Sequence, residues 1–137
     1  MTISQGSMIS AQQPEELHQL FVAYVNAHDV DALLALYEQD STVADLEGHP
    51  LQGIDNLRAF LIGFLAVVKQ IEGGTRKVLV SGNIALLSST YHAVLAAHDG
   101  GMTSITGISA EVTRRQSDGT WRFLIDDPQF VSVSAQS

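Results

Sequence analysis

The second half of this chain is divided by three short turns rich in glycine, and these turns limit its possible folds more than any other feature. The turns are residues 81–83 (Ser-Gly-Asn), 98–101 (His-Asp-Gly-Gly) and 116–120 (Gln-Ser-Asp-Gly-Thr). Each joins two extended segments rich in apolar and β-branched residues, which is typical of β-hairpins. The spacing predicts a four-stranded antiparallel meander whose last strand, 121–127, is stopped by Pro128.

Helical periodicity marks the first half of the chain. Pro14 and the two glutamates after it are typical of a helix start, and apolar residues then recur at helical spacing to about Ala27. A second helix is predicted over 30–39 and a third over 57–69, where apolar positions almost surround the helix. One short strand, 42–46, is predicted between these two helices.

The order of three helices with one inserted strand, followed by the meander, predicts the α+β class. We expect the helices to lie on one face of a curved antiparallel sheet. The length of 137 residues is enough for one hydrophobic core. We assign a single domain to residues 13–133, a flexible N-terminal arm to 1–12 and a short tail to 134–137.

Charge and residue usage exclude several kinds of partner. The 7 basic and 15 acidic residues give a net charge of −8, so the chain lacks the basic face that binding to nucleic acid requires. The chain has no cysteine, and its five histidines show no spacing typical of metal ligands. We therefore expect neither a metal nor a cofactor.

The N-terminal segment and the longest apolar stretch bear on the location of the protein. Residues 1–14 contain neither a basic region nor an apolar core of the kind found in signal peptides. The longest apolar stretch, 57–68, includes Arg58 and is too short to span a bilayer. We therefore expect a cytoplasmic protein without a membrane partner.

Asp45 stands at the end of the predicted strand 42–46, although aspartate is depleted in strands. Its carboxylate has two interpretations that the residues alone leave open. It can begin the turn that continues through Glu47 and Gly48. It can instead point into a cavity, where a carboxylate can move protons.

Two segments of the chain, 24–61 and 107–128, carry a resemblance to a known family. Their motifs are an Asn-x-x-Asp helix break (Asn26, Asp29), a strand ending in Asp45, a helix led by Gly53, and an Asp-Gly-x-Trp hairpin (Asp118, Gly119, Trp121). Over about residues 14–131 the chain resembles the nuclear transport factor 2-like superfamily, in particular its SnoaL-like and ketosteroid isomerase-like branch. The resemblance implies a cone in which the sheet curls around the helices and leaves an apolar pocket open at one end.

The resemblance implies more than one function, since this fold hosts enzymes, ligand binders and association domains. The first hypothesis is that the chain holds a small apolar molecule in the cone pocket. The alternative is a cofactor-free isomerase, lyase or cyclase that uses Asp45 as its general base. A homodimer built through the sheet is implied in both cases, and a monomer would leave a large apolar sheet face exposed.

Matched positions in the steroid isomerases imply roles for individual residues. Asp45 falls at the general base, and Glu111 falls, within one residue, at a protonated acid that helps to hold the substrate oxygen. Two pocket tyrosines of those enzymes correspond to Phe21 and Leu61. Loss of one oxyanion donor costs on the order of 10²–10³ in rate, so steroid isomerase activity itself is not expected.

The last strand has two possible orientations. The resemblance points Leu124 and Asp126 into the pocket, which makes Asp126 a further candidate acid. The amphipathic pattern instead predicts that Trp121, Phe123 and Ile125 are buried, and both orientations stay open at this point. The predicted ligand-binding residues are Phe21, Tyr24, Tyr37, Phe60, Leu61, Phe64 and Leu124.

Overall fold

The computed structural model describes residues 9–133 of the chain. Its elements are α1 (Glu16–Asn26), α2 (Val30–Leu34), β1 (Tyr37–Ala44), β2 (Pro50–Gln52), α3 (Ile54–Val67), β3 (Val68–Ser81), β4 (Ile84–Ala96), β5 (Met102–Arg115) and β6 (Trp121–Ser132). Within this part of the chain, no helix combines the length and the hydrophobicity needed to cross a membrane. The element order confirms the predicted α+β class.

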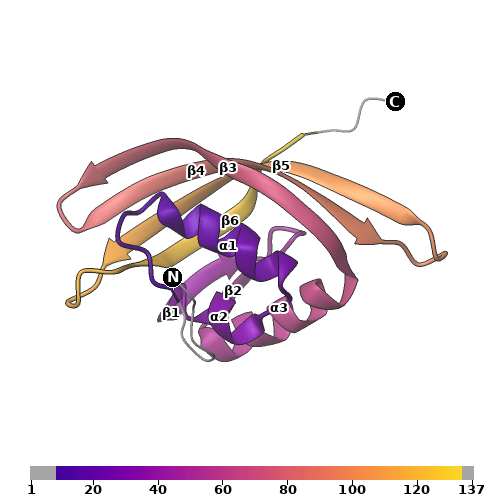
Figure 1. The fold of residues 1–137 in the computed structure, drawn as a ribbon, viewed down its shortest axis with the longest axis horizontal. Helices are drawn as coiled ribbons and strands as arrows, with labels where there is room; N and C mark the ends of the chain where they lie inside the picture. Colours follow the sequence, from indigo (N-terminus) through magenta and orange to yellow (C-terminus); the bar gives the residue numbers. More distant parts are fainter. Residues whose placement is uncertain (1–8, 134–137) are drawn as a thin grey trace.

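The strands form one curved sheet in the order β2-β1-β6-β5-β4-β3. Strands β3 to β6 are antiparallel neighbours, as the meander predicts, whereas β1 joins β6 in parallel. The long strands β3, β4 and β5 arch over α1, and α2 and α3 lie further below on the same side (Figure 1). The helices therefore occupy the concave face of the sheet, and none of the helices within residues 9–133 covers its convex face.

The turns between the meander strands require glycine. Gly82 has a φ of 59° between β3 and β4, and Gly119 has a φ of 86° between β5 and β6. These angles lie in the left-handed region, which glycine adopts without the steric cost of a Cβ atom. The glycine-containing turns of the sequence are thus confirmed as hairpin turns.

Strand β1 begins earlier than the sequence predicts and replaces the second half of the expected helix 30–39. The backbone N–H of Phe123 donates to the carbonyl of Leu36 at 2.8 Å, and Tyr37 pairs with Phe123 in the parallel ladder. This long-range pairing with β6 overrides the local helical pattern. The strand also ends at Ala44, one residue before Asp45.

Pro128 does not stop the last strand, because β6 continues to Ser132. Asp127 pairs with Ala110 of β5, and the next pairing joins Val131 to Ile108, so the ladder is irregular between these rungs. Proline has no N–H to donate and is tolerated at such irregularities. The predicted end at residue 127 is therefore wrong.

The prediction of a flexible N-terminal arm over residues 1–12 is wrong for residue 11, which is held in the fold. Ala11 is buried, and its carbonyl accepts a hydrogen bond from the N–H of Trp121 at 3.0 Å. This bridge ties the start of the domain to the first residue of β6. Residues 1–8 of the expected arm and the expected tail, 134–137, lie outside the described residues.

Strand β6 contains one extra residue opposite the step from Val112 to Thr113 of β5. Thr113 of β5 faces Phe123, and the next residue of β5, Val112, faces Ile125. Leu124 is therefore an extra residue, and the register shift is that of a β-bulge.

This bulge changes which side chains of β6 face the helices. Phe123 is only 1% exposed, as amphipathicity predicts, and Asp126 is only 7% exposed, as the resemblance implies. Ile125 is 47% exposed, so the amphipathic prediction is wrong at this position. Each of the two patterns is correct on one side of Leu124, because the extra residue reverses the alternation.

Candidate functional site

A cavity lies between the helices and the concave face of the sheet. It holds about 750 Å³ of space not filled by protein atoms, including its open mouth. Its walls are mainly apolar, with side chains from α1, α3 and the strands, among them Phe21, Phe60, Leu61, Phe64, Ile71 and Ile105. Such walls suit a small ligand that is itself largely apolar.

Four buried titratable side chains interrupt these apolar walls, beside the hydroxyl groups of Ser89 and Ser109. His18 comes from α1, Tyr37 from β1, Glu111 from β5 and Asp126 from β6, and all four line the cavity. Glu111 and Asp126 face each other directly across the β5–β6 ladder. Buried groups of this kind rarely occur unless they are paired or hydrogen-bonded.

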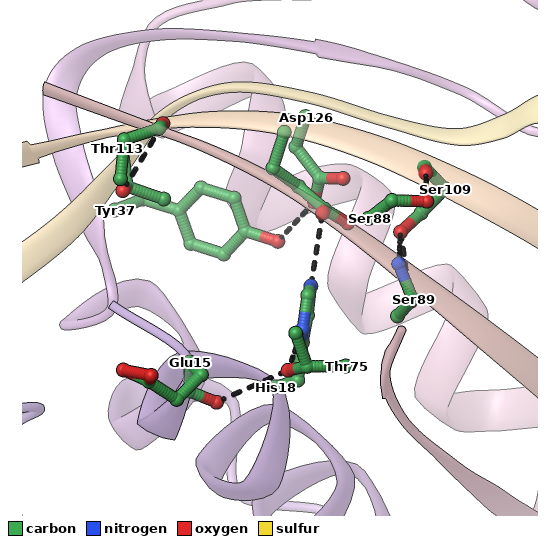
Figure 2. Close-up of polar contacts among 11 residues, drawn as sticks. Glu15, His18, Tyr37, Thr75, Ser88, Ser89, Ser109, Thr113 and Asp126 are labelled. Carbon is green, nitrogen blue, oxygen red and sulfur yellow. Dashed lines mark hydrogen bonds and ion pairs between the residues drawn. The ribbon is translucent and has the colours of Figure 1, made fainter. Parts of the chain in front are cut away.

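Each carboxyl group of the pair has its own partner. The Tyr37 hydroxyl donates to Oδ2 of Asp126 at 2.7 Å, and Figure 2 shows the tyrosine ring directed at this carboxyl group. Nε2 of His18 donates to Oε1 of Glu111 at 2.9 Å. Nδ1 of the same imidazole contacts the hydroxyl of Thr75 on β3, which fixes the ring from its other side.

Burial and, second, the negative charge of Glu111 together raise the pKa of Asp126 to about 8, against the lowering effect of the Tyr37 hydrogen bond. Burial first, and then the nearby Asp126, also raises the pKa of Tyr37 well above its ordinary value. Asp126 is therefore mainly a neutral carboxylic acid at neutral pH. A neutral acid on the wall of an apolar cavity can donate a hydrogen bond or a proton to a ligand oxygen.

His18 is the member of this cluster that the sequence reasoning missed. It is only 6% exposed, and it lies on the face of α1 that also carries Phe21, Val22 and Val25. The spacing of 18, 21, 22 and 25 is the i, i+3, i+4, i+7 pattern of a single helix face. A histidine in an otherwise apolar stripe was therefore the available signal.

Seven of the predicted site residues are brought together at the cavity, and three are not. The seven lining residues are Phe21, Tyr37, Phe60, Leu61, Phe64, Glu111 and Asp126. Tyr24 points elsewhere, since its hydroxyl is hydrogen-bonded to the backbone N–H and carbonyl of Ile9, both at 3.1 Å. Leu124 is the bulge residue of β6 and is also absent from the lining.

Asp45 is the third predicted site residue that does not line the cavity, and its side chain stabilises a turn instead. Its Oδ1 accepts hydrogen bonds from the backbone N–H groups of Glu47 and His49, each at 2.9 Å. The hydrogen bond from His49 is the main reason that the pKa of Asp45 is lowered. The predicted position inside the cavity is wrong, because the strand ends before this residue and the chain reverses through Gly48 at a φ of 90°.

We expect Asp45→Ala to destabilise the protein at neutral pH, because two backbone N–H groups lose their acceptor. Since the pKa of Asp45 is lowered, its contribution is complete above the ordinary value of 3.8 and is lost as the pH falls below it. Thermal melts at about pH 7 and about pH 3 test this, with Glu47→Ala as the control on a neighbouring exposed carboxylate. A variant as stable as wild type at neutral pH would contradict the assignment.

The same turn is the place where a cation could find several ligand atoms. Ligand atoms of Asp45, Glu47 and His49 lie within 4.8 Å of one another. Glu47 and His49 are exposed, and one oxygen of Asp45 already accepts two backbone hydrogen bonds. The geometry of the turn accounts for this cluster, and the expectation that the chain needs no metal stays a prediction.

Both the sequence and the fold of this chain are similar to those of known proteins. A profile described as the SnoaL-like domain matches residues 18–133. No curated protein matches the sequence. A ketosteroid isomerase-like protein from Erwinia carotovora atroseptica SCRI1043 has a TM-score of 0.77 and 16% identity, over 88% of this chain and 93% of that chain.

Two further solved structures have similar folds. A nuclear transport factor 2-like superfamily protein from Salmonella enterica serovar Typhimurium LT2 has a TM-score of 0.73 and 14% identity, over 90% of each chain. A domain with a cystatin-like fold from Nostoc punctiforme has a TM-score of 0.71 and 15% identity, over 87% of this chain and 75% of that chain. These similarities concern the fold, and they confirm the cone that the resemblance implies.

Proposed function

Since this chain belongs to the SnoaL-like domain family, we propose that it binds a small, mainly apolar molecule in the cavity and transfers a proton on it with its own side chains. One observation carries the proposal. Asp126 is buried on the cavity wall beside Glu111, and its pKa is raised to about 8. Perturbed acids of this kind in a cavity are typical of catalytic sites.

The proposed step uses Asp126 in two directions. Its neutral carboxyl group donates a proton to an oxygen of the ligand, and the resulting carboxylate takes a proton from a neighbouring carbon of the same ligand. The carboxyl group then returns to its starting state. His18 holds the Glu111 carboxylate and Tyr37 orients Asp126, so that the acid is presented to the cavity. The reaction classes that fit are isomerisation, elimination and cyclisation.

Binding without chemistry is the second candidate function. Phe21 and Leu61 are apolar where a hydroxyl donor would assist a reaction, and the remaining walls are largely aromatic and aliphatic. A cavity of this composition binds apolar molecules by burying their surface, whether or not a proton moves.

Hydrogen exchange on a simple ketone separates the two candidates. We expect the protein to bind α-tetralone and to accelerate the replacement of its α-protons by deuterium in heavy water, followed by NMR. General acid–base catalysis contributes roughly 10²–10⁴-fold, so Asp126→Asn should remove most of the acceleration while binding persists. Asp40→Asn, on an exposed carboxylate of β1, is the control. Binding without exchange would favour the second candidate, and absence of binding would contradict both.

We also propose that the protein forms a homodimer through the convex face of the sheet. Large apolar side chains gather there, and Leu86, Phe130 and Val131 line a groove while being 49%, 65% and 46% exposed. Monomers rarely expose so extended an apolar patch. A second copy of the chain is the occupant that would cover this face.

Light scattering is expected to report twice the chain mass of 14.7 kDa at micromolar concentration. Leu86→Glu should shift the equilibrium toward the monomer, because it introduces a charge into the buried face. Ile62→Glu, the same change at an exposed position of α3, should leave the dimer intact. A monomeric wild type would contradict the proposal.

A further inference from the structure

Tyr91 brings a further hydroxyl group to the cavity, apart from the buried cluster of His18, Tyr37, Glu111 and Asp126. It lies on β4, is half-buried and lines the cavity. Its oxygen accepts a hydrogen bond from Nε2 of Gln129 on β6. Among the residues that the structure describes, no acceptor for the proton of this hydroxyl is found within hydrogen-bonding distance. The donor capacity of Tyr91 is therefore available to a ligand.

The glutamine side chain is hydrogen-bonded at both ends. The hydroxyl of Ser132 donates to Oε1 of Gln129 at 3.0 Å. The amide N–H₂ group is the end that faces Tyr91 in the structure. Gln129 occupies an acceptor site of the tyrosine oxygen and leaves the O–H directed elsewhere.

The neighbouring strands leave room for this arrangement. Tyr91 pairs with Gly73 of β3 on one side and with Gly107 of β5 on the other. A Cβ atom at Gly107 would lie 2.7 Å from both the Tyr91 hydroxyl oxygen and Nε2 of Gln129. At Gly73 it would lie 2.8 Å from Cβ of Tyr91. Both distances are shorter than real Cβ contacts. A side chain at Gly107 would therefore displace the ends of the Tyr91 and Gln129 side chains, and one at Gly73 would collide with the backbone of β4.

We propose that Tyr91 is a specificity-determining residue, whose hydroxyl donates a hydrogen bond to an oxygen of the ligand, and that Gln129 is its positioning residue. This inference rests on the proposed function of the cavity. The ligand class it selects is a compact apolar molecule that carries a carbonyl or ether oxygen. Burial raises the pKa of Tyr91 against the lowering effect of the Gln129 hydrogen bond, and nearby carboxylates add to the rise, so the hydroxyl keeps its proton at neutral pH.

A matched pair of probes tests the proposal. α-Tetralone and tetralin share a carbon skeleton, and only the first has an oxygen acceptor. We expect Tyr91→Phe to weaken α-tetralone binding by about tenfold, the size of one hydrogen bond, and to leave tetralin binding unchanged. Gln129→Glu should weaken α-tetralone binding similarly although Tyr91 is retained, because the new carboxylate would accept the tyrosine proton. Tyr24→Phe is the control, since that hydroxyl bonds to Ile9.

Dissociation constants from ligand-observed NMR titrations distinguish the possible results. A selective loss of α-tetralone affinity in both variants supports the roles of Tyr91 and Gln129. Equal losses for both probes in Tyr91→Phe would mean a packing role and would overturn the inference, as would unchanged affinities. In each of these cases the wild type still binds, so the proposed binding of a small molecule in the cavity is unaffected. If the wild type binds neither α-tetralone nor tetralin, both the proposed function and this inference are overturned.

Discussion

The Asp126→Asn variant is expected to melt at a higher temperature than wild type at about pH 8, and at a similar temperature at about pH 4. Burial and the charge of Glu111 raise the pKa of Asp126 from 3.8 to about 8. Asparagine has no proton to lose, and its side-chain oxygen can still accept the hydrogen bond from Tyr37. Thermal unfolding followed by circular dichroism across this pH range measures the difference.

The sign follows from the two states of the wild type. Below about pH 4 the carboxyl group is protonated in both the folded and the unfolded chain, so ionisation does not affect stability. Between that pH and about 8 the unfolded chain releases the proton and the folded chain retains it, so wild-type stability falls as the pH rises. The advantage of the variant should grow by at most about 1.4 kcal/mol per pH unit. Asp40→Asn is the exposed control, and an advantage that shrinks with rising pH would contradict the assignment.

The second large effect is expected for His18→Leu, which removes the partner of a buried carboxylate. Glu111 is 4% exposed and accepts its side-chain hydrogen bond from His18. Breaking a buried pair on one side typically costs about 3–5 kcal/mol, because the remaining charge has no compensation. Urea unfolding at neutral pH should report a loss of this size in the free energy of unfolding.

Two further variants identify the cause of that loss. The double variant His18→Leu with Glu111→Gln should recover much of the stability, since the amide carries no charge. Thr75→Val removes the other contact of the same imidazole and should cost only about 1 kcal/mol, as expected for one hydrogen bond. If the double variant is as unstable as His18→Leu alone, lost packing rather than the unpaired charge is responsible.

The sequence predicts the fold well because its signals are local. The turns around Gly82 and Gly119 identify the hairpins, and helical spacing identifies α1 and α3 within a few residues. The end of α2 is predicted poorly, because the residues from Tyr37 onward pair with β6, which lies far away in the sequence. Local propensity contains no information on such a partner.

The sequence predicts only part of the candidate site, because local patterns contain no information on distant partners. Glu111 and Asp126 line the cavity, as the family resemblance implies, although the alternation of β6 alone would have turned Asp126 away from it. Asp45 is misplaced because position along the sequence does not reveal that the strand ends at Ala44. His18 is missed because its partner, Glu111, lies 93 residues away in the sequence.

The extra residue in β6 has a consequence for the way related sequences are compared. Leu124 takes up no rung of the ladder with β5, so Phe123 and Asp126 are two rungs apart although they are three residues apart. Deleting Leu124 would leave both side chains inward, whereas pairing it regularly would turn Asp126 to the convex face. The equivalent of this acid in a related chain is therefore found by counting ladder rungs from the hairpin. An alignment gap at this point is compatible with an unchanged cavity.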